Sequence, residues 1–182
     1  MKRIGFRGAP RWAAMAFATT LAALTLSSGA ASAAEALERG ASGLPLPRFV
    51  SLSSSEVNVR VGPSFNHKVV WTFTKSGLPV EIVREFGNWR QVRDADGEEG
   101  WVHQSLLSGR RTVLVSPWSQ NENVPLRAEA KASAHPVAYL QPNVLGNVDR
   151  CDGSWCSISG KGWRGVVPQR QLWGVYPSEE VK

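Results

Sequence analysis

The stretch that decides the fold is Val57-Asn58-Val59-Arg60-Val61-Gly62-Pro63-Ser64. Its valines alternate with polar residues, which is the period of a strand with one buried face. Gly62 and Pro63 follow, and we expect them to shape the next loop, because glycine permits positive φ and proline fixes the φ that comes after it. The three valines should therefore face a core. Asn58 and Arg60 should lie on the opposite face, either solvated or as the polar wall of a peptide groove.

The same pattern returns about 67 residues later, in Val124-Pro125-Leu126-Arg127. Three other segments repeat in the same order, and the offset falls to 65, as expected if only loops changed length. The matches are 69–73 with 136–140, 89–92 with 155–158, and 100–102 with 165–167. This order predicts an internal duplication.

Each unit is expected to consist of short strands. β-branched and aromatic residues alternate with polar ones, and Gly87-Asn88 and Asp96-Gly97 are typical of hairpin turns. Residues 122–134 contain good helix formers, but Pro125 and Pro136 interrupt or bound them, so we expect no helix there. About five strands in 60 residues can bury an apolar face by curling into a small barrel.

The first 33 residues have the features of a secretory signal peptide. Four basic residues lie among the first eleven, an uncharged run covers 12–26, and Ala31-Ser32-Ala33 fits a peptidase site. Cleavage is expected between Ala33 and Ala34. The alternative is a membrane anchor, but the run is shorter than the ~20 apolar residues that cross a bilayer. We expect a secreted, periplasmic protein with no membrane span after cleavage.

Charge argues against a nucleic-acid partner. The chain has 21 Lys and Arg against 15 Asp and Glu, but four of the basic residues belong to the expected signal peptide. The remainder is nearly balanced and has no basic stripe of the kind that follows a phosphate backbone.

The Asn-Val-Arg-x-Gly-Pro-Ser string, Gly87-Asn88-Trp89 and Gly100-Trp101-Val102 resemble the bacterial SH3 domain. The segments 44–52 and 172–177 resemble an exported two-repeat SH3-like family of Gram-negative bacteria. The resemblance implies an all-β protein with two small SH3-like barrels in tandem and a binding role in the cell envelope. The second half departs from the pattern, with Glu129 and Ala130 at the Gly-Pro position and Val166 at the position of Trp101.

The expected organisation follows from the repeat and the resemblance. It is a signal peptide (1–33), a linker (34–48), repeat one (49–115), an inter-repeat linker (116–123), repeat two (124–177) and a tail (178–182).

Two tryptophans are the main candidates for ligand contact. If Val92 and Val102 fill the barrel, Trp89 and Trp101 share its outer face and form an apolar platform for a peptide or a sugar. The alternative is that the linker arm or the other repeat covers them. The ligand-binding candidates are Asn58, Arg60, Gly62, Pro63, Trp89 and Trp101. Trp118 is expected to hold the two barrels together.

Cys151 and Cys156 flank the turn signal Asp152-Gly153, so in an oxidising compartment they should form a disulfide. The alternative is a nucleophilic cysteine with His135 as its partner. The three histidines are scattered along the chain, and the acids near 94–99 fit a solvated hairpin loop. We therefore expect no catalytic residue, metal or cofactor.

The sequence predicts a non-catalytic envelope protein that binds peptidoglycan or peptide segments. The alternatives are a structural adaptor for another envelope protein and, third, a cell-wall hydrolase.

Overall fold

The computed structural model describes residues 38–182. The signal peptide expected over 1–33, and its cleavage site between Ala33 and Ala34, lie outside the described residues. Within residues 38–182, no helix has both the length and the apolar character needed to cross a bilayer.

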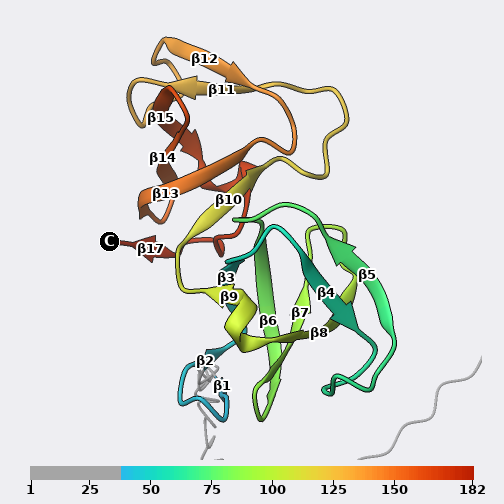
Figure 1. The fold of residues 1–182 in the computed structure, drawn as a ribbon. Helices are drawn as coiled ribbons and strands as arrows, with labels where there is room; N and C mark the ends of the chain where they lie inside the picture. The colour runs from blue at the N-terminus through green and yellow to red at the C-terminus, as the bar shows by residue number, and fades with distance from the viewer. Residues whose placement is uncertain (1–37) are drawn as a thin grey trace, which may run out of the picture. The chain divides into compact units, whose positions relative to one another are not determined.

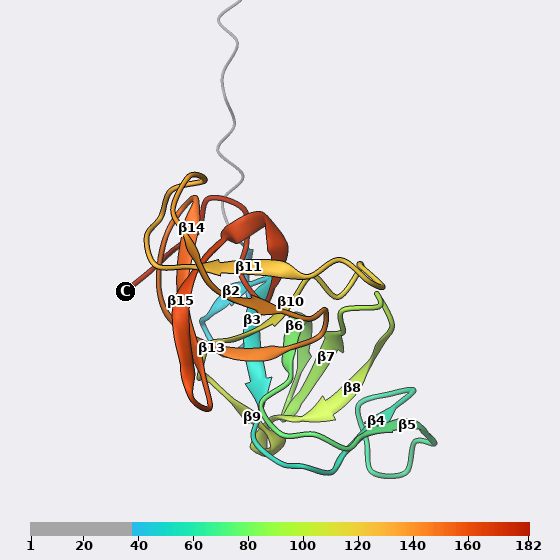
Figure 2. The ribbon, with the colours of Figure 1, turned by 90° about the horizontal axis from the view of Figure 1, so that it is seen from above.

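The first repeat is a seven-stranded antiparallel sheet with the order β5-β4-β8-β7-β6-β3-β9. A single 3-10 turn, η1 (Gln104–Leu106), links its last two strands. The strands are β3 (Arg48–Leu52), β4 (Val57–Arg60), β5 (Val69–Phe73), β6 (Pro79–Phe86), β7 (Trp89–Arg93), β8 (Glu99–His103) and β9 (Leu107–Ser108). A short hairpin of β1 (Glu38–Arg39) and β2 (Pro45–Leu46) precedes them. Figure 2 shows the β4–β5 hairpin at the edge of this sheet, beside β8.

The second repeat forms an antiparallel sheet with the order β12-β11-β15-β14-β13-β10-β16, and β17 pairs with β13. Its strands are β10 (Thr112–Val115), β11 (Val124–Arg127), β12 (Pro136–Leu140), β13 (Leu145–Asp152), β14 (Trp155–Gly160), β15 (Trp163–Pro168), β16 (Leu172–Trp173) and β17 (Glu180–Val181). The 3-10 turn η2 (Gln169–Gln171) precedes β16. The order of β3 to β9 is thus repeated strand for strand in β10 to β16 (Figure 1), as a duplicated unit predicts. Residues 122–134 contain no helix, as expected.

The pairing of β10 corrects the boundary expected at residue 115. β10 hydrogen-bonds to β13 and β16, so it belongs to the second sheet and occupies the place that β3 has in the first. The 116–123 segment is therefore a loop inside the second repeat. The two ends of the chain also differ from expectation, because the expected linker contains the β1–β2 hairpin and the expected tail contains β17.

Each sheet curls around its own apolar core, as an SH3-like barrel requires. The first core contains Val57, Val59, Val92 and Val102, all fully buried. The second contains the disulfide between Cys151 and Cys156, which face each other across β13 and β14. The predicted disulfide is confirmed.

Two details at the end of β4 differ from expectation. Val61 is exposed, because the strand ends at Arg60 and the alternation stops there. Gly62 does not adopt positive φ. The absence of a side chain serves a different purpose: a β-carbon there would lie 2.7 Å from the imidazole of His67, and glycine lets that ring lie over the loop.

Direct contacts join the two sheets. The ring of Phe49 in β3 packs edge-on against Trp173 at 5.0 Å and at a tilt against Tyr176 at 4.7 Å. The Tyr176 hydroxyl donates to Glu81 at 2.9 Å, and the Thr112 hydroxyl donates to the Gly77 carbonyl at 2.7 Å. The aromatic contact between sheets is made by these residues rather than by Trp118, which is 61% exposed.

Candidate functional site

The register of β7 and β8 places both candidate tryptophans on one face. Trp89 pairs with His103, and Gln91 pairs with Trp101. Since residues two apart in a strand point the same way, Trp89 and Trp101 share the outer face. Val92 and Val102 point into the core. This is the geometry expected from the sequence.

Phe65 covers one of the two indoles. Trp89 is only 8% exposed, because the ring of Phe65 lies edge-on against it at 4.9 Å. The imidazole of His103 lies 5.4 Å from the indole and 5.5 Å from the Phe65 ring. Phe65 itself is 68% exposed, and Trp101 is partly exposed. We call Phe65, Trp89, Trp101 and His103 the aromatic face.

This cover was not among the alternatives taken from the sequence, which were the linker arm and the other repeat. It comes instead from the loop that follows β4. Phe65 stands three residues after Gly62, in a loop without period, so its position could not be inferred from spacing. His103 could have been found, because it follows Trp101 by two residues on the same face and lies opposite Trp89 once the hairpin at Gly97 fixes the register.

Arg60 shapes the loop that carries Phe65. Its Nη1 donates to the carbonyl of Phe65 at 3.1 Å and to that of His67 at 2.7 Å. Its guanidinium also lies 5.8 Å from the centre of the Phe65 ring. Arg60 pairs with Trp101 in the ladder, so it belongs to the outer face. Its hydrogen bonds, however, make it a positioning residue for the loop.

The remaining candidates flank this arrangement. Asn58 lies on the same side of β4 as Arg60, and its side-chain oxygen accepts from the Thr72 hydroxyl at 2.8 Å. Pro63 is half-buried beside Gly62, which is buried under the His67 ring. The structure therefore brings Arg60 and the two tryptophans onto one surface, with Asn58 at its edge and Gly62 and Pro63 in the supporting loop.

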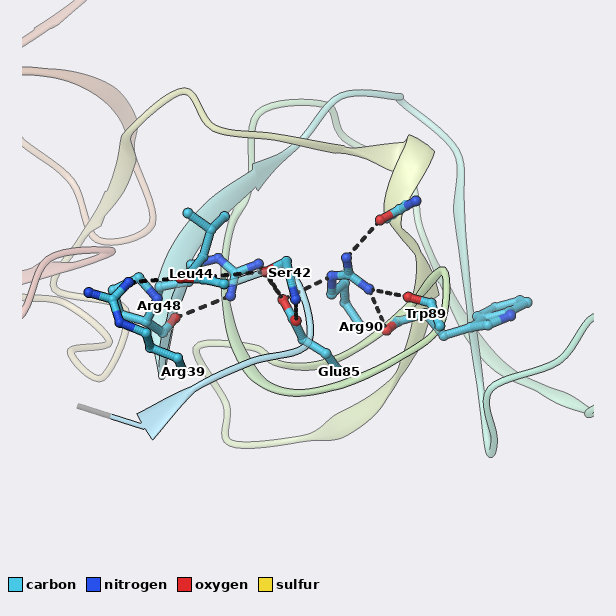
Figure 3. A network of polar contacts seen from close by, with 11 residues as sticks. Arg39, Ser42, Leu44, Arg48, Glu85, Trp89 and Arg90 are labelled. Atoms are coloured by element: carbon cyan, nitrogen blue, oxygen red, sulfur yellow. Dashed lines mark hydrogen bonds and ion pairs between the residues drawn. The ribbon is translucent and has the colours of Figure 1, made fainter. Parts of the chain in front are cut away.

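A polar network fixes the hairpin of β1 and β2 to the same repeat (Figure 3). The carboxylate of Glu85 accepts from the Ser42 backbone N–H at 2.7 Å, from its hydroxyl at 2.8 Å and from Arg48 at 2.7 Å. The Glu85 side chain is almost fully buried, and Arg90 also lies 3.2 Å from it. These contacts hold the 38–46 segment in place.

Arg90 links this network to the backbone of Trp89. It donates to the carbonyls of Gly87 and Trp89 and to the side chain of Gln104. In Figure 3 the backbone of Trp89 meets Arg90, while its indole extends away from the network. The Gly87-Asn88 turn closes this hairpin, with positive φ at the glycine, as the sequence predicts.

The network sets the protonation of Glu85. Burial alone would raise its pKa, but the hydrogen bonds from Ser42 and Arg48 and the charge of Arg90 lower the pKa to about 2. Glu85 is therefore an anion at neutral pH, and it serves as an anchor for the segment.

A family model described as the bacterial SH3 domain matches the chain twice, over residues 53–109 and 120–174. The chain belongs to the bacterial SH3 domain family. The two matches correspond to the two duplicated sheets, so the protein has tandem SH3 domains.

This chain is similar to parts of longer proteins. A Bacillus subtilis (strain 168) protein named "Putative N-acetylmuramoyl-L-alanine amidase YrvJ" is 25% identical over 122 residues, which are 62% of this chain and 23% of that protein. Two solved structures from Trichomonas vaginalis, NlpC2 and NlpC1, are each 16% identical, with TM-scores of 0.32 and 0.33. The similarity covers 70% and 74% of this chain, and 48% of each of theirs. The chain thus spans about a quarter to a half of the length of these proteins.

The second SH3 domain has a different surface at the equivalent place. Trp155 stands where Trp89 does, but Val166 replaces Trp101, and no phenylalanine follows Ala130 in the 128–134 loop. Trp155, Ala130 and Val166 instead line a small pocket of about 290 Å³ together with Arg150. The aromatic face is therefore a property of the first domain.

A larger groove, of about 840 Å³, lies between the domains and was not expected from the sequence. Its walls come from β3 and the 94–97 turn of the first domain, and from the 116–119 turn, η2 and the 172–178 segment of the second. Because it forms only when the two sheets pack together, no single motif could have indicated it.

Proposed function

We propose that the protein is a non-catalytic cell-envelope binding protein, exported to the periplasm, whose first SH3 domain recognises peptidoglycan or its peptide segments through the aromatic face. The observation that carries this proposal is the exposed Phe65 ring, which packs edge-on against Trp89 on the outer surface that also carries Trp101.

The arrangement suits a ligand with flat apolar surfaces. Aromatic rings contribute large contact areas at little conformational cost, and Trp101 and His103 each add a polar N–H at the rim. Arg60 holds the loop that carries Phe65, so the surface is formed before a ligand arrives. Such a surface is fit for peptide or sugar contact.

The ligand class has support from a relative. The amidase from Bacillus subtilis is named for N-acetylmuramoyl-L-alanine, and the part of it that is similar to this chain is a minority of its length. The simplest explanation of that similarity is a binding module that the two proteins share. Peptidoglycan is therefore the first ligand to test.

The test is retention of the mature protein on purified sacculi. Phe65→Ala and Trp101→Ala should each reduce the retained fraction several-fold, because each removes contact area at the surface. Tyr139→Ala is the matched control, since Tyr139 is 64% exposed on β12 of the second domain and should leave retention unchanged. Equal retention of all variants, or none by the wild type, would reject the proposal.

The same preparation separates the alternatives. An adaptor would be favoured if the protein is not retained on sacculi and if crosslinkers placed on the aromatic face trap one dominant protein in cells. Release of soluble muropeptides by the purified protein would favour a hydrolase.

A further inference from the structure

The groove between the two SH3 domains has an exposed tryptophan on its rim. Trp118 lies in a turn closed by a hydrogen bond from the Ser119 N–H to the Ser116 carbonyl, and it lines the groove. Ser116 is buried and has a φ of 35°, a conformation that is costly for a residue other than glycine. The chain thus maintains an unusual turn that keeps a large apolar side chain in solvent.

The same groove has an aromatic wall. Phe49, Trp173 and Tyr176 are in mutual contact through Phe49, and Tyr176 is fixed further by its hydrogen bond to Glu81. Because these residues come from both domains, the contacts that join the domains also hold the wall in place. A ligand in the groove would meet preformed apolar surface.

The first domain contributes two carboxylates from its 94–97 turn. Asp94 uses Oδ1 to accept from the backbone N–H groups of Asp96 and Glu98, and the Asp96 carboxylate accepts no hydrogen bond within residues 38–182. Neither forms an ion pair with a described residue. The nearby Arg93 is already engaged by Glu81 and Glu99. Among the described residues that line the groove, Arg170 of η2 is the only cation without an ion pair, so the unpaired charge of the lining is negative in sum.

Two buried polar groups at the groove lack partners among the described residues. Gln169 is buried, and its Nε2 donates to the carbonyls of Tyr176 and Glu179, which leaves Oε1 without a donor. The indole Nε1 of Trp173 has no acceptor. A buried polar group without a partner costs about 1–3 kcal/mol. A peptide group offers both an N–H and a C=O to the two groove-lining residues that carry these atoms, Gln169 and Trp173.

We propose that this groove is a second binding site, specific for a peptide segment that carries a primary amine. The amine pairs with Asp94 and Asp96, and the Trp118 ring, which lines the same groove, supplies a cation–π contact. The adjoining peptide groups lie along Trp173 and Gln169. The site is independent of the aromatic face, because no residue is shared between them.

The probe is the tripeptide Ala-Lys-Ala with an acetylated amino end and an amidated carboxyl end, so that its only charge is the side-chain amine. It is titrated into ¹⁵N-labelled mature protein, and the indole N–H resonances report the site. We expect the resonances of Trp118 and Trp173 to shift saturably. The same peptide with norleucine in place of lysine should bind more weakly.

Two variants test the contacts. Trp118→Ala should weaken binding roughly 2- to 5-fold, as loss of an exposed cation–π contact predicts. Asp96→Asn should weaken it by a similar factor without disturbing the turn, because the Asp96 side chain makes no hydrogen bond there. Tyr139→Ala is the matched aromatic control, and Phe65→Ala controls for the aromatic face. Both should bind the tripeptide like the wild type.

Three results would overturn the proposal. These are no shift at Trp118 or Trp173, equal binding of the norleucine peptide, or a preference of these resonances for an uncharged glycan such as chitotriose over the lysine peptide. Each can occur whether or not the protein is retained on sacculi. Failure here and failure of the proposed function are therefore distinguishable.

Discussion

The ring of Phe65 lies 4.9 Å from the indole of Trp89 and buries it on the outer surface of the first SH3 domain. A tryptophan that points away from the core is thereby withdrawn from solvent by the loop between β4 and β5. The exposed aromatic of this surface is the phenylalanine, with the indole as its support.

Phe65→Ala should expose Trp89 without unfolding the domain. An edge-on aromatic pair contributes about 0.5–1.5 kcal/mol beyond its area, so the loss in unfolding free energy should stay in that range. Tryptophan fluorescence should move to longer wavelength and become more accessible to acrylamide. Unchanged quenching would show that Phe65 does not cover the indole.

Glu85→Gln should release the hairpin of β1 and β2. The neutral amide loses the charge-assisted bonds to Arg48 and Arg90, and it offers one acceptor oxygen in place of two. Limited proteolysis should then cut within residues 39–44 much faster than in the wild type. Glu56→Gln, on an exposed loop, is the matched control and should not change the cleavage rate.

The same anchor should respond to acid. The pKa of Glu85 is about 2 when the hairpin is docked, below its ordinary value of 4.5. A lowered pKa means that the stabilisation is fully present above about pH 4.5 and is lost as the pH falls toward 2. Amide exchange of the Ser42 N–H, followed against pH, should show the hairpin opening in that window. Opening centred above pH 5 would contradict this assignment.

Removal of the disulfide by Cys151→Ala/Cys156→Ala should lower the unfolding free energy by about 2 kcal/mol, because the bridge closes only a short loop. The loss should appear in the second domain. Reduction of the wild type should shift its thermal midpoint in the same direction. A shift confined to the signals of the first domain would be inconsistent with the structure.

Gly174→Ala should weaken the junction between the domains. Gly174 has a φ of 116°, and a β-carbon there would collide with the Thr112 carbonyl and approach the Pro79 ring at 3.1 Å. We expect destabilisation of more than about 1 kcal/mol. Gly109→Ala is the control, because a β-carbon at that position meets open space.

The fold was predictable because its signals are local. Alternating valines fix a strand and its buried face. The outward direction of Trp89 and Trp101 followed from their spacing from Val92 and Val102 alone. The duplication was visible because corresponding strands keep their order. The disulfide followed from two cysteines facing each other across a turn.

What could not be predicted depends on loops and on packing between units. Phe65 lies in a loop with no period, so nothing in the sequence linked it to Trp89. β10 is an apolar strand that fits either sheet, and only its hydrogen bonds to β13 and β16 assign it. From the sequence, Trp118 was expected to pack between the domains. In the structure it is exposed and lies in the turn that begins at Ser116.

The most direct test of the central claim is a titration of the ¹⁵N-labelled mature protein with soluble peptidoglycan fragments, followed through the tryptophan indole resonances. We predict saturable shifts at Trp89 and Trp101, loss of the Trp89 shift in the Phe65→Ala/Trp101→Ala variant, and no change at Trp155 and Trp163 of the second domain. Shifts at the second-domain indoles alone, or no shift at any concentration reached, would contradict it.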